Sequence, residues 1–269
     1  MTATRFHKMH GLGNDFVVID ARDITVDMSP PRAAAIANRR TGIGCDQLIM
    51  LEPSTIATLR MRIFNADGGE VEACGNATRC VAMLIGEPAT IETLAGILHT
   101  QPGDAQASVM LGQPAFDWEL IPLAMPIDTS DMPVSWDELD HPAAVNVGNP
   151  HVIFFVDDCD AVDLETLGPR IENDPLFPER VNVNVASVVG DQAIKLRVWE
   201  RGVGLTRACG TGACATAVAA IRSRRVKSPV TVHLPGGDLV IDWVEGGMIQ
   251  MSGPAAHVFS GETDWDAFG

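Results

Sequence analysis

Short hydrophobic runs recur along this chain, and their spacing predicts many strands and only a few helices. Residues 16–19 and 152–155 are continuous apolar runs rich in β-branched and aromatic side chains, a pattern typical of buried strands. Residues 58–64 and 194–199 alternate between apolar and polar side chains, which predicts strands with one face exposed to water. Each half of the chain is therefore expected to be mostly β-structure.

Helix signals are fewer. Four segments predict helices, namely residues 32–39, 77–85, 163–171 and 212–224. The first follows Ser29-Pro30-Pro31, a favourable helix start, and the second is stopped by Gly86 and Pro88. Two Gly-Gly pairs lie between strand-like runs and predict hairpins, Gly236-Gly237 and Gly246-Gly247.

The chain repeats itself at an offset of 135 residues, the separation between Cys74 and Cys209. Residues 62–77 and 197–212 share one pattern, in which an alternating strand and a glycine-containing turn precede a cysteine followed by glycine. Further pairs at this offset are Gly13 and Gly148, Asn14 and Asn149, and Gln47 and Asn182. A repeat at about half of the 269 residues predicts an internal duplication with two similar domains.

Prolines crowd the stretch between the two copies, from Pro114 to Pro142. Because such a composition punctuates regular structure, we expect the chain to cross between domains there. The expected N-terminal domain covers residues 1–117 and is completed by the tail, residues 255–269. The expected C-terminal domain covers residues 118–254. The predicted fold class is α+β, with two pseudo-symmetric domains.

Composition excludes several kinds of protein. A net charge of −16 argues against a nucleic-acid or anionic-membrane partner, because both require a basic surface. Apolar residues make up 46% of the chain, which is enough for a packed core in each half. Six cysteines are too sparse for a disulfide scaffold, and neither a secretory signal nor a membrane-spanning run is visible. We therefore expect a cytoplasmic protein that carries thiols.

Two of these thiols stand where a helix is expected to begin. Cys74-Gly75-Asn76 and Cys209-Gly210-Thr211 both open a predicted helix, whose first backbone N–H groups have no partner within the helix. These groups and the helix dipole favour an anion, either a thiolate with a lowered pKa or a bound carboxylate. One cysteine in each half predicts two thiols that act on opposite faces of one carbon, with the N–H groups stabilising its carboxylate.

The remaining cysteines favour other interpretations. Cys80 and Cys214 fall inside the helices and are expected to pack in the core, whereas Cys159 lies in an acidic loop and Cys45 is assigned no role. A zinc-binding or thiol-redox protein is the alternative from another class. Five residues separate Cys74 from Cys80 and four separate Cys209 from Cys214, and no histidines cluster beside them, so the spacing does not favour structural zinc.

Several motifs together resemble those of the diaminopimelate epimerase family. They include His10-Gly11-Leu12-Gly13-Asn14, Gly44-Cys45-Asp46-Gln47, Asn65-Ala66-Asp67-Gly68, Cys74-Gly75-Asn76, Gly148-Asn149-Pro150-His151, Glu200-Arg201-Gly202, Ala208-Cys209-Gly210-Thr211 and Ser252-Gly253-Pro254. The resemblance covers about residues 8–254. It differs at Ala77-Thr78, where the family's commonest motif has Gly-Ala, and we expect activity to survive because the N–H groups of Gly75 and Asn76 remain.

The resemblance implies a fold, an activity and a mode of action. Each domain would be a β-sheet wrapped round a central helix. The protein would convert LL-2,6-diaminopimelate to the meso form in lysine and peptidoglycan biosynthesis, as a homodimer that uses neither pyridoxal phosphate nor a metal. The lysines of the chain also argue against pyridoxal phosphate. The three are Lys8, Lys195 and Lys227, and none of them sits in a phosphate-binding glycine loop.

The resemblance also implies a role for each matching residue. Cys74 and Cys209 would be the acid and base thiols, and His151 and Glu200 would tune them. Arg201 would bind the distal carboxylate, for which its planar fork is well suited. The rest of the substrate-binding set would be Asn14, Gln47, Asn65, Gly75, Asn76, Asn149, Asn182, Glu200, Gly210 and Thr211. The closest enzymatic alternative is a proline-racemase-like enzyme, which also uses paired thiols but has less need of an arginine for a distal carboxylate.

Overall fold

A computed structural model describes residues 4–72 and 74–268 and divides the chain into two units. The first unit runs up to Val109 and resumes at Gly253, and the second unit is Met110–Ser252. The proline-rich stretch therefore belongs to the second unit, where Ile121, Leu123 and Met132 pack into the core. The expected functional domains, residues 1–117 with the tail 255–269 and residues 118–254, remain predictions.

The first unit holds most of its strands before its central helix. Its elements are β1 (Thr4–Gly11), β2 (Asn14–Asp20), α1 (Pro30–Ala37), β3 (Gln47–Glu52), β4 (Leu59–Asn65), β5 (Glu70–Val71), α2 (Gly75–Ile85), β6 (Ala89–Thr93), β7 (Gly96–Pro102), β19 (Ala256–Thr263) and the 3-10 helix η1 (Trp265–Phe268). Strand β19 pairs with β1, so the tail completes this unit's sheet. The strands β8 (Gln106–Met110) and β18 (Gln250–Pro254) contain the limits between the units.

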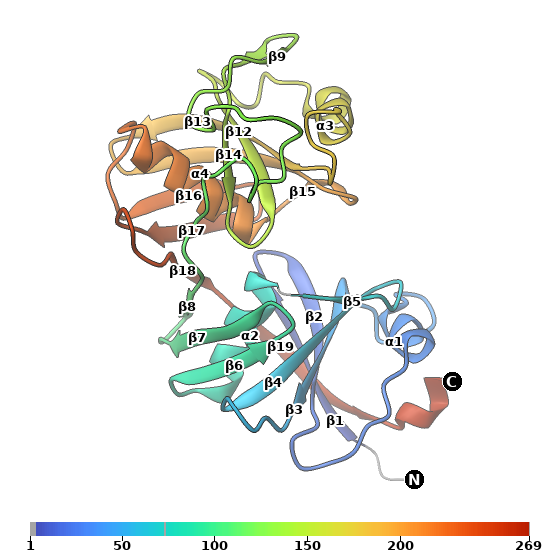
Figure 1. Cartoon of the computed structure of the whole chain (residues 1–269). Helices are drawn as coiled ribbons and strands as arrows, with labels where there is room; N and C mark the ends of the chain where they lie inside the picture. Colours follow the sequence, from blue (N-terminus) through green and yellow to red (C-terminus); the bar gives the residue numbers. More distant parts are fainter. Residues whose placement is uncertain (1–3, 73, 269) are drawn as a thin grey trace. The chain divides into compact units, whose positions relative to one another are not determined.

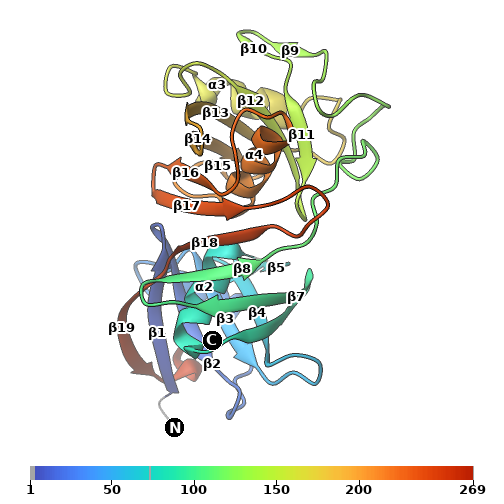
Figure 2. The ribbon, with the colours of Figure 1, turned by 90° about the vertical axis from the view of Figure 1, so that its left-hand side faces the viewer.

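The second unit repeats the same order. Its elements are β9 (Ser135–Trp136), β10 (Leu139–Asp140), β11 (Ala143–Asn146), β12 (Pro150–Phe155), α3 (Leu164–Glu172), β13 (Asn182–Gly190), β14 (Ala193–Glu200), β15 (Gly204–Thr206), α4 (Gly210–Arg222), β16 (Val230–Leu234) and β17 (Gly237–Asp242). Figures 1 and 2 show α2 among the strands of the first unit and α4 among those of the second. Both helices are buried over most of their length.

The strand register confirms the duplication. Strands β2 and β3 are parallel with Phe16 opposite Gln47, and β12 and β13 are parallel with His151 opposite Asn182, which is the same pair 135 residues later. Beyond the central helix the offset grows. Ile91 of β6 pairs with β4, and Val232 of β16, which is 141 residues later, pairs with β14 in the same way. The offset grows because both α4 and the loop that follows it are longer than their counterparts in the first unit. The predicted α+β fold of two similar halves is confirmed.

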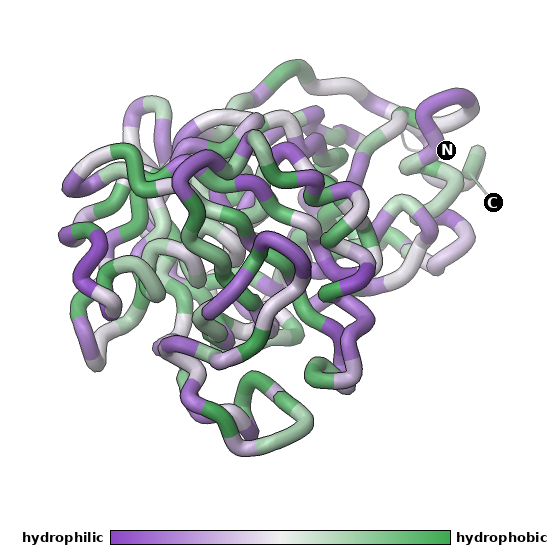
Figure 3. Tube along the Cα trace, turned by 90° about the horizontal axis from the view of Figure 1, so that it is seen from above, coloured by the Kyte–Doolittle hydropathy of each residue, from purple (hydrophilic) through white to green (hydrophobic). Residues whose placement is uncertain are grey.

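The predicted helices are confirmed, but three of them begin two residues earlier than expected. The helices α2 and α4 begin at Gly75 and Gly210 because Cys74 and Cys209 are themselves the N-caps, both with extended backbone. Ser29 caps α1, which starts at Pro30, where a proline is well tolerated because its missing N–H has no helical partner. Hydrophobic and hydrophilic segments alternate along the whole trace (Figure 3), in keeping with strands that are buried on one face.

Candidate active site

The Cys74 thiol is half-buried at the N-terminus of α2. Its Sγ donates to Oδ1 of Asn14 over 3.8 Å, and the backbone carbonyl of Cys74 accepts from Thr78 Oγ1 at 2.8 Å. Asn14 follows the turn at Leu12 and Gly13, which both have left-handed backbone and so direct the chain from β1 into β2. The first unit thus brings together the predicted residues Cys74 and Asn14.

The other predicted amides of the first unit form two pairs. Asn76 Nδ2 donates to the same Asn14 Oδ1 at 3.5 Å, and Gln47 Nε2 donates to Asn65 Oδ1 at 2.9 Å across the β3–β4 register. Buried Arg79 donates to Asn76 Oδ1 at 2.6 Å, which fixes the orientation of that amide. Sequence reasoning missed Arg79, because nothing local marks a buried arginine.

A charged network behind Asn14 was also missed. Asp46 accepts hydrogen bonds from Asn14 Nδ2 at 3.2 Å and from the Asp15 backbone N–H at 3.0 Å. Arg39 donates to both Asp15 and Asp46, and Lys8 forms an ion pair with Asp15. Although partial burial raises the pKa of the Asp15 carboxyl, hydrogen bonds from Arg39 and Lys8 hold it well below its usual value. The network of hydrogen bonds and ion pairs keeps the Asn14 loop in place.

The Cys209 thiol is buried, with 4% of the residue exposed, and it has different partners. Its Sγ accepts from the Gly212 backbone N–H at 3.4 Å and lies 3.6 Å from Thr211 Oγ1. Burial raises the pKa of this thiol well above its ordinary value, and the neighbouring Glu200 carboxylate raises it further. Burial also raises the pKa of Glu200, although hydrogen bonds with Thr206 and Cys209 act in the opposite direction and lower it. The second unit therefore brings Cys209 and Glu200 together as a coupled acid pair.

A chain of neutral groups lies beside the start of α4. Asn184 Nδ2 donates to His151 Nδ1 at 3.1 Å, so the proton of the neutral ring is on Nε2, which donates to Asn149 Oδ1 at 2.9 Å. Asn184 Oδ1 lies so close to Gly212 that a side-chain Cβ there would come within 2.7 Å of it. Asn184 was missed because Asn149 and His151 belong to a sequence motif, whereas this residue is one position within an apolar strand.

His151 itself is fully buried, and burial lowers its pKa to about 3 despite the hydrogen bond from Asn184. The ring is therefore neutral near pH 7. It orients Asn149 through a hydrogen bond and carries no charge of its own toward a thiol.

The predicted residues Asn182 and Arg201 are joined through the backbone. Asn182 is buried, and its Oδ1 accepts from the Arg201 N–H at 3.0 Å while its Nδ2 donates to the Pro150 carbonyl at 2.8 Å. The Arg201 guanidinium donates one hydrogen bond, to the Glu179 carbonyl at 2.9 Å. Both polar atoms of Asn182 therefore hold protein backbone, and Arg201 keeps N–H donors for an anion.

Cys80 and Cys214 are buried as expected, and Cys159 and Cys45, for which no packing role was predicted, are buried as well. Cys80, Cys159 and Cys214 are completely buried, and Cys45 lies in the core around α1. Burial raises the pKa of Cys45 to about 11 and that of Cys80 to about 12, so neither thiol is poised to ionise near neutrality. Within residues 4–72 and 74–268, no three His, Cys, Asp or Glu side chains gather as a metal site. No helix in that part of the chain is long and apolar enough to span a membrane.

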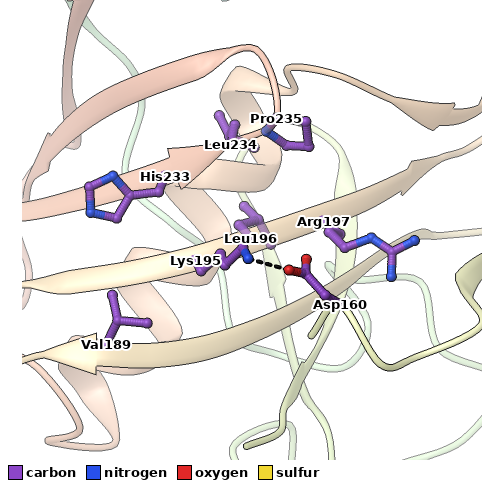
Figure 4. Close-up of a pocket in the computed structure, with 8 residues that line it drawn as sticks. All are labelled: Asp160, Val189, Lys195, Leu196, Arg197, His233, Leu234 and Pro235. Atoms are coloured by element: carbon purple, nitrogen blue, oxygen red, sulfur yellow. Dashed lines mark hydrogen bonds and ion pairs between the residues drawn. The ribbon is translucent and has the colours of Figure 1, made fainter. Parts of the chain in front are cut away.

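A cavity of about 440 Å³ lies elsewhere on the second unit (Figure 4). Its lining consists of Asp160, Val189, Lys195, Leu196, Arg197, His233, Leu234 and Pro235. Lys195 forms an ion pair with Asp160, and Arg197 donates to the carbonyls of Cys159 and Val162. None of the predicted site residues lines this cavity, so it is not the place where their chemistry occurs.

Comparison with known proteins identifies first a class and then a family. The fold is similar to that of a phenazine biosynthesis PhzF-family protein from Enterococcus faecalis, with a TM-score of 0.71 at 13% identity, covering 98% of this chain and 100% of that one. The profile of the diaminopimelate epimerase family matches residues 6–116 and 143–258. A diaminopimelate epimerase of Sphingopyxis alaskensis is 73% identical over 99% of this chain and all of its own, and one of Rhizorhabdus wittichii is 67% identical over 98% and 97%. The chain belongs to the diaminopimelate epimerase family.

The neutral His151 predicts an acid-sensitive fold. Its pKa lies below that of an unfolded histidine, so unfolding takes up a proton between about pH 3 and 6.5, and stability falls as the pH falls through that range. From pH 7 to pH 5 this one group should cost about 2 kcal/mol. The measurement is the free energy of unfolding by urea for the wild type and for His151→Gln, which can form hydrogen bonds but does not titrate. The difference in the free energy of unfolding between the wild type and His151→Gln should shrink from pH 7 to pH 5. A difference that stays constant over this range would contradict a buried neutral ring.

Proposed function

We propose that this protein epimerises LL-2,6-diaminopimelate to the meso form, with Cys74 and Cys209 as the two acid/base groups. Membership of the diaminopimelate epimerase family supports the reaction. The observation that carries the mechanism is that each cysteine is the N-cap of the same helix in a duplicated unit. The family match favours this activity over a proline-racemase-like one, and the need to bind a distal carboxylate gives Arg201 a role.

The proposed reaction transfers one proton at each thiol. One cysteine, as the thiolate, removes the α-hydrogen, and the electron pair of the broken C–H bond is delocalised into the adjacent carboxylate. The other cysteine, as the thiol, donates its proton to the opposite face of the same carbon. The two sulfurs thereby exchange protonation states, and no other atom is gained or lost. The first backbone N–H groups of α2 and α4, from Gly75, Asn76, Gly210 and Thr211, would stabilise the charge that develops on the carboxylate.

Polar side chains in both units would orient the substrate without taking up protons near pH 7. Asn14, Gln47, Asn65 and Asn149 are amides, which bind an ammonium or a carboxylate equally well. In this proposal Asn182 acts by holding Arg201, and His151 acts by orienting Asn149. The resemblance to the family supports two further proposals, that the protein is a homodimer and that it works in the cytoplasm without pyridoxal phosphate or a metal.

Replacing either cysteine by alanine should remove nearly all epimerisation, because each is required in one protonation step. The assay follows conversion of LL-diaminopimelate to the meso form with purified wild type, Cys74→Ala and Cys209→Ala. Cys159→Ala, which removes a buried thiol of the second unit, is the matched control and should retain activity. Substantial epimerisation by either active-site variant would contradict the two-thiol mechanism.

Glu200 should make the two thiols unequal. Because the carboxylate raises the pKa of Cys209 and burial restricts access to it, alkylation near pH 7 should label Cys74 well before Cys209. Glu200→Gln removes the charge but keeps the shape, so it should speed labelling of Cys209 and narrow the difference. Mass spectrometry of peptides after timed alkylation measures both rates. The exposed Glu165→Gln makes the same change in net charge and should leave both rates unaltered. Equal rates in the wild type, or no effect of Glu200→Gln, would reject this role.

A further inference from the structure

The last residue of α3, Glu172, is a buried carboxylate with three donors around it. Only 5% of the residue is exposed. Its Oε1 accepts from the Gly202 backbone N–H at 2.8 Å and from Arg180 Nη1 at 3.3 Å, and its Oε2 accepts from the Trp199 indole N–H at 2.7 Å. Burying a carboxylate is costly unless it is fully hydrogen-bonded, so this cluster is a built feature of the unit.

All three donors belong to segments that hold Arg201. Trp199 lies in β14, two residues before Arg201. Gly202 follows Arg201 in the turn between β14 and β15 and has a left-handed backbone, with φ of 75°. Arg180 directly follows Glu179, whose carbonyl accepts the hydrogen bond from the Arg201 guanidinium. One carboxylate therefore binds the backbone directly after Arg201, a side chain of the strand before it, and the segment that orients the Arg201 side chain.

Close packing adds to these bonds. A Cβ placed on Gly168 of α3 would come within 2.5 Å of the Trp199 ring, so the indole lies directly against the helix backbone. The glycine permits an approach that brings the indole N–H to Glu172, one turn further along the same helix.

The first unit shows that the fold does not need this cluster. At the repeat offset, Glu172 corresponds to Ala37, Trp199 to Phe64 and Arg201 to Ala66. Helix α1 and strand β4 still form and pack there, with Ala33, Ala37 and Phe64 in one apolar cluster. The second unit thus has all three groups, the Glu172 carboxylate, the Trp199 indole N–H and Arg201. The first unit has an apolar residue at each of the three positions.

We propose that Glu172 is a positioning residue for substrate binding, which holds the Arg201 turn in the geometry that receives the distal carboxylate. This rests on the proposed function, in which Arg201 binds that carboxylate. Side chains that bind substrate must be held closely, since a displacement of about 1 Å can cost on the order of 100-fold in rate. A carboxylate that accepts from a backbone N–H, an indole N–H and a guanidinium is a stiff support for such a turn.

Glu172→Gln tests the proposal in the full-length protein. The amide keeps the shape but carries one N–H2 group, so it meets either Gly202 or Trp199 with a donor against a donor. We expect kcat/KM for LL-diaminopimelate to fall on the order of 10-fold. Arg201→Lys alone should lose roughly 10- to 150-fold, because it removes one of two parallel hydrogen bonds to the distal carboxylate. In the Arg201→Lys background, Glu172→Gln should then cost less than about 3-fold, because the residue it positions is already gone.

Asp174→Asn is the matched control. Asp174 follows α3 and accepts from the indole N–H of Trp136 and from the backbone N–H of Leu176, both at 2.9 Å. The amide therefore places a donor against one of these two N–H groups, as in Glu172→Gln, without touching the Arg201 turn. It should change kcat/KM by less than about 2-fold. Trp199→Phe removes the indole N–H but keeps a ring against Gly168. Its loss in kcat/KM should also be smaller in the Arg201→Lys background than in the wild type, so it replaces Glu172→Gln as the test if that variant does not fold.

The outcomes separate this inference from the function on which it rests. If Arg201→Lys leaves kcat/KM unchanged, the assigned role of Arg201 fails. If Arg201→Lys is impaired but Glu172→Gln and Trp199→Phe are not, the positioning role fails. Equal losses from Glu172→Gln in the wild-type and Arg201→Lys backgrounds would also overturn it, because they would show a general structural effect.

Discussion

A cysteine at the first turn of a buried helix is the constraint on which the site depends. The first backbone N–H groups of a helix need partners, and both central helices have a cysteine as the N-cap and begin at the glycine that follows it. At Cys209 the Gly212 N–H already donates to the thiol. The surrounding strands bury each helix and leave its N-terminus as the place where polar chemistry can occur. Because the same arrangement is made twice, one duplication supplies a thiol at the same position of each central helix.

The two copies have since become different where the chemistry requires it. Near Cys74 lies the amide of Asn14, which is supported by the hydrogen-bond network of Asp15, Asp46 and Arg39. Around Cys209 there is a titratable carboxyl, Glu200, whose pKa is raised by burial along with that of the thiol. An epimerase that works with one thiolate and one thiol benefits from such a difference, because two identical thiols would share the charge without preference.

The sequence was sufficient for the fold class, the repeat and the presence of the two central helices, because these depend on local patterns at a fixed offset. It was less informative about residues whose importance comes from contacts distant along the chain. Asn184, Arg79 and Glu172 stand in ordinary strand or helix positions, and only the packed structure shows that they hold His151, Asn76 and the Arg201 turn. The helix limits were missed by two residues because the cysteines, chosen for their chemistry, also serve as caps. The neutrality of His151 likewise depends on complete burial, which no local pattern reveals.

The most direct test of the two-thiol account is where solvent hydrogen enters during the first turnovers. LL-Diaminopimelate is mixed with the enzyme in deuterated water, the reaction is stopped while little product has formed, and both isomers are analysed by mass spectrometry. Because one sulfur removes the hydrogen and the other, exchanged with solvent, returns a deuteron, the meso product should carry one deuterium and the recovered substrate almost none. Equal early labelling of substrate and product would mean that a single group serves both faces, and it would contradict the account.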